Sequence, residues 1–228
     1  MANQRERTFQ MYNMFDIDFS RLNEWDMPIL RRCDHIPTDL LSFNYALTAK
    51  TYEKGIHFYL DDYQFERIWN NPHKYMDILK KYDCVLTPDF SLYADMPIPM
   101  QIWNVYRSRL IGQIMADYGM KVIPTLQWAK VDSYNFAFDG IEKGGVVSVS
   151  TVGIKKNKDA KKLFFDGMSE ALKRIEPSCV VIYGSNVGFD FGKTKIIEIK
   201  NHNVERVRKW EEEAQAQGQT LGAEKTEM

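Results

Sequence analysis

The sequence has little cysteine, and it lacks the cysteine and histidine patterns that mark common metal sites. Its three cysteines, Cys33, Cys84 and Cys179, are widely spaced, and no CxxC, HExxH or HxH pattern occurs. This spacing argues against a structural zinc site. Unpaired cysteines that open apolar runs are typical of buried core residues in a reducing compartment. We therefore expect a cytoplasmic protein.

Long apolar runs and an excess of one charge are also missing. No segment approaches 18 uncharged apolar residues, which predicts no membrane-spanning helix, and the opening MANQRERTFQ lacks the apolar stretch of a secretory signal. The 30 Lys and Arg residues balance the 31 Asp and Glu residues. The charge pattern therefore carries no strong nucleic-acid signature. Phosphate-binding GxGxxG and GxxxxGK[ST] motifs and the nucleophile motif GxSxG do not occur either.

What is present is a globular composition, with 44% hydrophobic residues in 228. We expect an N-terminal arm at residues 1–25, a single α/β domain at 26–210 and a disordered tail at 211–228. The arm carries large apolar side chains without a clear period, namely Phe9, Met11, Tyr12, Met14 and Phe15. Exposed apolar side chains of this kind predict self-association or a protein partner.

Short β-rich segments alternate with helical patterns along the domain. The predicted strands are Leu40–Asn44 (the weakest), Ile56–Asp62, Cys84–Asp89, Lys121–Trp128, Val146–Thr151, Cys179–Ser185 and Ile196–Ile199. Helices are expected after Pro72, from Pro99 to a stop at Gly119, and after a cap at Asn157. This alternation predicts repeated βα units and a mainly parallel sheet.

The strand patterns do not decide whether that sheet closes into a barrel or stays open. Polar residues recur at every second position, as in Thr87 and Asp89 or Thr125 and Gln127, whereas a sheet covered on both faces has strands that are apolar throughout. A barrel with a polar interior produces this pattern, and so does an open sheet with one poorly covered face. The segment is short for an eightfold barrel. We favour a small or incomplete TIM-like barrel over a doubly wound open sheet.

Ligands of parallel α/β folds bind at the carboxyl ends of the strands. Three carboxylates, those of Asp61, Asp62 and Asp89, lie at such ends and are the candidate catalytic residues. Carboxylates held close together raise one another's pKa or bind a hard cation. Asp61 and Asp89 are therefore candidate ligands of Mg²⁺ or Mn²⁺.

Neutral polar and aromatic residues occupy the same strand ends. The candidate substrate-binding residues are Trp128, Gln127, Tyr183, Ser185 and Ser91. Tryptophan stacks on sugars and bases, whereas the hydroxyl and amide groups form hydrogen bonds.

Structural roles explain some of these residues equally well. Asp62 precedes a helical segment and is suited to cap it. Asp89 follows Pro88 in a loop, where aspartate commonly forms turns. Trp128 at a strand end is also suited to packing alone. These alternatives stay open at the level of sequence.

The segment from HFYLDD through TPDFSLYADMP resembles a known domain family of unknown function. The resemblance rests on the run LDD–PDFSLYxDMP and extends from Pro28 to Ser185. That family occurs in bacteriophages, plasmids and bacterial genomes, so the resemblance implies a mobile-element protein in a bacterial host cell. It implies no activity, cofactor or catalytic residue.

Three functions fit these observations. The first is a hydrolase acting on a phosphoester, nucleotide or glycoside through the clustered aspartates. The second is a non-catalytic module that binds or sequesters a small molecule or nucleotide in the same polar pocket. The third is a protein-interaction or replication-associated factor that uses the N-terminal arm.

Overall fold

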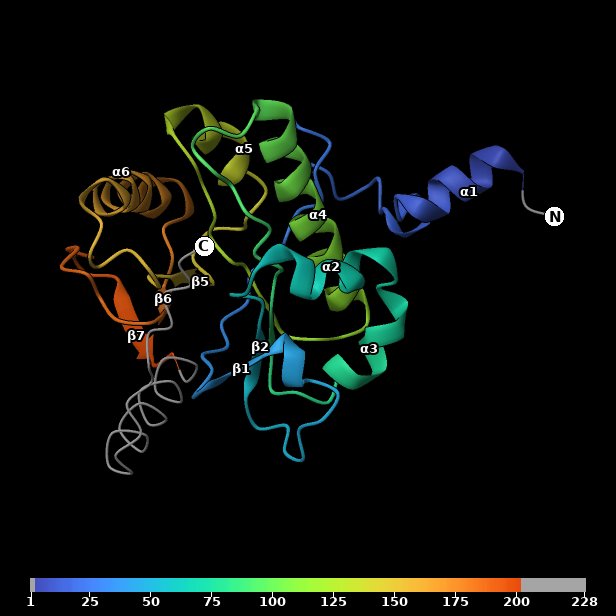
Figure 1. Cartoon of the computed structure of the whole chain (residues 1–228), viewed down its shortest axis with the longest axis horizontal. Helices are drawn as coiled ribbons and strands as arrows, with labels where there is room; N and C mark the ends of the chain where they lie inside the picture. The colour runs from blue at the N-terminus through green and yellow to red at the C-terminus, as the bar shows by residue number, and fades with distance from the viewer. Residues whose placement is uncertain (1–2, 202–228) are drawn as a thin grey trace, which may run out of the picture.

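The computed structural model describes residues 3–201, so the tail expected at 211–228 lies outside the described residues. Its strands are β1 (Leu40–Ser42), β2 (Gly55–His57), β3 (Val85–Leu86), β4 (Val122–Ile123), β5 (Val146–Ser150), β6 (Cys179–Tyr183) and β7 (Lys195–Ile199). Each of the seven predicted strands is confirmed, although β2, β3 and β4 are shorter than their apolar segments. Figure 1 shows the arrangement of the elements.

The helices lie between the strands, as the alternation predicted. They are α1 (Gln4–Met11), α2 (Asp62–Asn70), α3 (His73–Leu79), α4 (Ile98–Asp117), α5 (Tyr134–Ala137) and α6 (Lys158–Ile175), with 3-10 turns at Met14–Asp16, Phe43–Tyr45 and Val131–Ser133. Gly119 ends α4 with a φ of +83°, as expected of a glycine that follows a helix. Within residues 3–201, none of the helices has the length and apolar character needed to cross a membrane.

The strands form two parallel sheets, one of order β1-β2-β3-β4 and one of order β5-β6-β7. Every strand pair within them is parallel. A single parallel bridge between Thr125 and Ser148 connects the sheets, with hydrogen bonds of 2.7 Å from the Leu126 N–H to the Ser148 carbonyl and 2.8 Å from the Ser148 N–H to the Pro124 carbonyl. The strands therefore follow one another in chain order across both sheets. The prediction of a mainly parallel α/β fold is confirmed.

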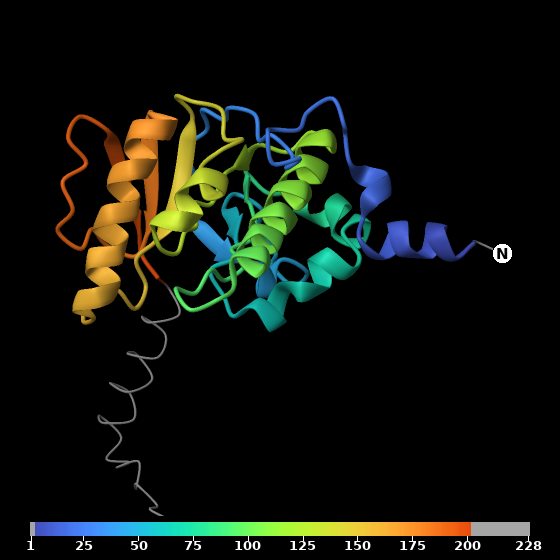
Figure 2. The same cartoon turned by 90° about the horizontal axis from the view of Figure 1, so that it is seen from above.

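Two of the three apolar clusters lie between helices and strands. One packs α2, α3 and α4 against the four-stranded sheet, and the other packs α5 and α6 against the three-stranded sheet; Figure 2 shows α4 and α6 lying along these faces. The third cluster contains buried side chains from strands of both sheets, among them Leu40, Leu86, Val146 and Val181. The strands thus have a second apolar surface that the helices do not cover.

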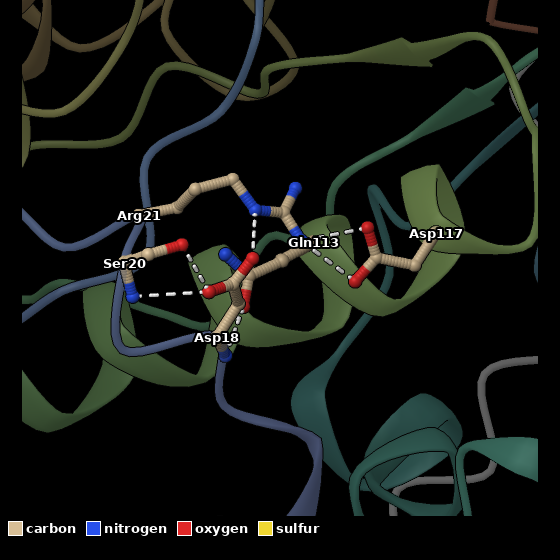
Figure 3. Close-up of polar contacts among 5 residues, drawn as sticks. All are labelled: Asp18, Ser20, Arg21, Gln113 and Asp117. Carbon is tan, nitrogen blue, oxygen red and sulfur yellow. Dashed lines mark hydrogen bonds and ion pairs between the residues drawn. The ribbon is translucent and has the colours of Figure 1, made fainter.

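The segment around residues 17–25 is tied to the C-terminal half of α4. The Arg21 guanidinium donates to the Asp18 carboxylate at 2.5 Å and to both Asp117 oxygens at 2.7 and 2.9 Å. The Asp18 N–H donates to Gln113 Oε1 at 3.2 Å (Figure 3). The first part of the predicted arm differs, because α1 has no buried residue and projects from the body in Figure 1.

Asn157 caps α6 and provides a test of how firmly this helix is held. Its side-chain oxygen accepts hydrogen bonds of 3.0 Å from the backbone N–H groups of Asp159 and Ala160. We expect Asn157→Ala to lower the free energy of unfolding by about 1 kcal/mol, because two N–H groups lose their acceptor. Urea denaturation measures the change. Asn157→Asp keeps an acceptor and is the matched control; an equal loss in both variants would contradict the capping role.

Candidate functional site

A cavity of about 420 Å³ lies at the carboxyl ends of β2 to β5. Asp89 follows β3, Gln127 and Trp128 follow β4, and Ser150 ends β5. The other lining residues are mostly apolar and come from β5, from loops and from the first turns of α6: Leu60, Ser91, Leu92, Tyr93, Leu126, Val149, Val152, Ile154, Ala160, Leu163 and Phe164. Parallel strands present their carboxyl ends on one edge, so residues distant in the chain meet here.

Asp89 is the carboxylate that lines this cavity. Burial, with the nearby Asp62 carboxylate as the second cause, raises the pKa of Asp89 from 3.8 to about 7. Asp89 in turn contributes, after burial, to raising the pKa of the Tyr59 hydroxyl. Within residues 3–201, no hydrogen bond or ion pair fixes the Asp89 carboxyl group. A carboxyl group with these properties exchanges protons near neutral pH.

Asp62 lies beside Asp89 and holds the loop that follows β3. Its carboxylate accepts hydrogen bonds of 3.1 and 3.2 Å from the Ser91 N–H and one of 2.8 Å from the Ser91 hydroxyl. Asn104 on α4 donates to the Ser91 carbonyl at 2.7 Å. Helix α2 begins at Asp62 itself, so Asp62 connects this helix to the cavity wall instead of occupying the cap position.

Asp61 is placed differently from the other two aspartates. It is the N-cap residue of α2, its side chain is exposed, and it accepts a hydrogen bond of 3.1 Å from Gln64 Nε2. It does not line the cavity. The structure thus brings Asp62 and Asp89 together and leaves Asp61 at the surface beside them.

Gln127 and Trp128 form one wall of the cavity. Gln127 is only 8% exposed and donates to the Phe90 carbonyl at 3.3 Å, while its Oε1 atom has no hydrogen-bond donor among the described residues. The Trp128 indole N–H donates to the Leu163 carbonyl at 3.1 Å, which fixes the ring against α6. The indole N–H is thus used in a hydrogen bond within the fold, whereas the rest of the Trp128 side chain is free to line the cavity.

Tyr183 and Ser185 lie outside the cavity lining. Tyr183 is buried, its hydroxyl donates to Asn201 at 3.0 Å, and burial raises its pKa to about 12. Its ring stacks on Tyr59 with centroids 5.1 Å apart. Ser185 is exposed, and its backbone N–H and carbonyl are both bonded to the Thr151 hydroxyl.

Sequence reasoning missed two parts of the site. Tyr59 does not line the cavity, but it is close enough to Asp89 for the carboxylate to raise its pKa, and its hydroxyl is 2.5 Å from the Ser148 hydroxyl. Leu163 and Phe164 cover the cavity from α6. The alternation of polar residues along the strands includes Tyr59 and could have marked it as part of the site. No sequence pattern indicates that one face of α6 lines a cavity.

The cavity combines an apolar interior with a few polar groups, which is the usual composition of a small-molecule site. Asp89 gives it one group able to accept or release a proton near neutral pH. Flat apolar surface comes from Trp128 and Phe164. The arrangement can therefore hold a ligand of modest size and exchange a proton with it.

Comparison with known proteins gives a family and two curated relatives. The sequence profile of a domain of unknown function, DUF4417, matches residues 19–202. The Gene 1 protein of Mycobacterium phage L5 is 39% identical over 169 residues, which cover 73% of this chain and 74% of the phage protein. The Gene 1 protein of Mycobacterium phage D29 is 37% identical over 169 residues, which cover 73% of this chain and 63% of that protein. No solved structure matches the chain.

Proposed function

Because the chain belongs to the DUF4417 family of domains of unknown function, we propose its role from the cavity at Asp89, where we infer that it binds a small organic molecule. The observation that carries this proposal is a cavity of about 420 Å³ whose carboxyl group, that of Asp89, has no fixed partner among the described residues. Ligand pockets commonly enclose about 300–1,000 Å³. The size suits a ligand of one or two rings.

The walls of the cavity favour a flat ligand. Trp128 and Phe164 are 5.7 Å apart between ring centroids and both line the cavity. Aromatic side chains bind flat rings by stacking, which adds about 0.5–1.5 kcal/mol to the burial of their area. The neighbouring Leu126 and Val149 add apolar surface that needs no hydrogen-bond partner.

The polar groups favour a ligand that donates hydrogen bonds. Asp89 accepts them when ionised, whereas Gln127 Oε1, which also has no donor among the described residues, is itself buried. A ligand with adjacent N–H groups, such as an amidine or an aminopyrimidine, can donate to both oxygens of the Asp89 carboxylate. A cationic ligand also stabilises the ionised form of Asp89 and so lowers its pKa.

Benzamidine, a planar ring with a cationic N–H edge, is a suitable probe. We expect it to bind the wild-type protein in saturation-transfer NMR and calorimetry, and Asp89→Asn to weaken binding by about tenfold or more, because a charge-assisted hydrogen bond contributes about 1.5–3 kcal/mol. Asp61→Asn removes an exposed carboxylate outside the cavity and is the matched control. Equal affinity for wild type and Asp89→Asn would place the binding elsewhere and refute the proposal.

A hydrolase is the second candidate, and the pKa of Asp89 near 7 is the observation that favours it. Asp62 is held by the Ser91 N–H and hydroxyl, and paired carboxylates in unlike environments are typical of acid–base catalysis. A Mg²⁺ or Mn²⁺ ion at Asp61 and Asp89 requires the Asp61 side chain to turn away from Gln64. Release of nitrophenol from nitrophenyl phosphates or glycosides, lost in Asp89→Asn, would establish hydrolysis.

We further propose that the two sheets form an incomplete TIM-like barrel. The chain order of the strands and the bridge between Thr125 and Ser148 support it. The apolar cluster drawn from strands of both sheets supports it as well, as does the contact between the tilted rings of Tyr183 in β6 and His57 in β2, whose centroids are 4.3 Å apart. In such a barrel the cavity lies at the catalytic end.

The setting and partners are proposed on separate observations. The phage relatives and the free cysteines Cys33, Cys84 and Cys179 favour the cytoplasm of a bacterial host cell. A protein partner or a second copy of the chain is proposed for the N-terminal arm, because Met11 and Phe15 are 60% and 65% exposed.

A further inference from the structure

The amino ends of the strands, opposite the cavity of Asp89, bring a histidine, a carboxylate and a thiol together. His35 precedes β1, whereas Asp83 and Cys84 directly precede β3. One ligand atom from each residue lies within 4.8 Å of the other two. In the described part of the chain, no other three His, Cys, Asp or Glu side chains bring their ligand atoms this close together. The separation of 48 positions between His35 and Asp83 explains why no sequence motif marks the group.

The three atoms are near the spacing that a metal ion requires. Ligand atoms around a tetrahedral Zn²⁺ are about 3.3–3.8 Å apart, because each is about 2.0–2.3 Å from the ion. His35 Nε2 and Asp83 Oδ2 are 2.6 Å apart, so these atoms must separate slightly while Cys84 Sγ approaches. His35 and Asp83 are about three-quarters buried, and Cys84 is fully buried.

The hydrogen bonds around His35 indicate which protons move when an ion binds. Lys121 Nζ lies 3.5 Å from His35 Nδ1, which must accept because an ammonium only donates; His35 Nε2 then carries the proton shared with Asp83. When an ion binds Nε2, the ring proton moves to Nδ1 as Lys121 withdraws, so the imidazole stays neutral and only the Cys84 thiol proton leaves to solvent.

A second cavity of about 350 Å³ reaches the group at His35, whereas Asp83 and Cys84 are not among its lining residues. His35, Cys33 and Lys121 line it, and Figure 3 shows others of its residues, Arg21 and Asp117 among them. Water in this cavity can supply a fourth ligand, as in sites with three protein ligands and one open position.

We propose that His35, Asp83 and Cys84 form a site for a divalent transition ion of the Zn²⁺ class, with its fourth position open to the second cavity. The donor set decides the class of ion, because sulfur and imidazole ligands favour zinc-like ions over Mg²⁺ and Mn²⁺. The site is separate from the cavity of Asp89 and does not depend on the function proposed for it.

The Lys121 ammonium competes with a metal ion for the Asp83 carboxylate. Its ammonium lies 3.2 Å from Asp83 Oδ1, so it occupies the carboxylate when no ion is bound. It is 53% exposed and can withdraw into solvent. Lys121→Met removes this competing cation and is expected to tighten ion binding by about threefold to tenfold.

Titration with Co²⁺, followed by absorption, tests the proposal. We expect one equivalent to bind with d–d bands of tetrahedral cobalt and a thiolate-to-cobalt charge-transfer band, both removed by excess Zn²⁺. Cys84→Ser should lose the charge-transfer band, and His35→Gln should weaken binding by about tenfold or more. Cys179→Ser changes a buried thiol outside the group and is the control, with circular dichroism verifying every fold.

Two results would overturn the proposal. One is the absence of a charge-transfer band in wild type at saturating Co²⁺. The other is a band that survives in Cys84→Ser, which would assign the thiolate to Cys33 or Cys179. If Cys84→Ser does not fold, His35→Gln decides, because wild-type affinity in that variant would equally refute the site.

Discussion

Replacing Asp89 by asparagine is expected to stabilise the protein above pH 7 and to have a much smaller effect near pH 4. Burial and the Asp62 carboxylate raise the pKa of Asp89 from 3.8 to about 7 in the folded state. Between these values the folded protein holds a proton that the unfolded chain has lost. The wild type therefore loses stability as the pH rises from about 4 to about 7, with no further change from this group above that.

The asparagine side chain cannot ionise, so the Asp89→Asn variant avoids this loss. The full shift corresponds to about 4 kcal/mol, at about 1.4 kcal/mol for each tenfold change in proton affinity. Asp89 is only partly buried at the cavity wall, so solvent screening reduces the expected gain to about 2 kcal/mol. Urea denaturation of both proteins at pH 5 and pH 8 measures it, with Asp61→Asn as the control. A stability difference that does not change with pH would show that Asp89 is ionised throughout this range and remove the basis for proton transfer at this site.

Gly167→Ala is expected to cost about 2–3 kcal/mol of unfolding free energy, although alanine favours helices over glycine by about 1 kcal/mol. A methyl group at this position of α6 would lie 2.0 Å from Trp128 Nε1 and 2.4 Å from two carbons of the same ring. Trp128 must then move, and its hydrogen bond to the Leu163 carbonyl breaks. The moved ring changes the cavity wall, so benzamidine affinity should fall with stability.

A double-mutant cycle isolates this contact. Trp128→Leu removes the ring, so Gly167→Ala should cost at least about 1 kcal/mol less in that background. Ser169→Ala, on the exposed face of α6, controls for helix propensity. If Gly167→Ala costs the same with and without Trp128, the close approach of helix and ring is not the cause.

The elements of the fold were predictable because each carries a local signal. Apolar segments such as Cys179–Ser185 have the length of a buried strand, and Asn157 and Gly119 mark helix ends by chemistry that needs no distant partner. The extent of pairing was not predictable. Only Val122 and Ile123 pair as a strand within Lys121–Trp128, because pairing depends on where the neighbouring strand runs.

The candidate site was predicted in part for a related reason. Asp89, Ser91, Gln127 and Trp128 line one cavity because parallel strands end on a common edge. Which residue of a pair such as Asp61 and Asp62 turns inward depends on the first turn of α2, and this geometry has no signature in the sequence. The group of His35 and Asp83 lies at the other edge, and its members are too far apart in the chain to form a sequence motif.

The strand order has a consequence for how the chain is made. Since β1 to β7 neighbour one another in the order in which they are translated, each strand that leaves the ribosome meets an edge that is already formed. Among residues 3–201, no strand has to wait for a partner at the far end of the chain, so each pairing closes a shorter loop than a pairing between the ends would. The protein can thus fold during its own synthesis, from the first strand toward the last.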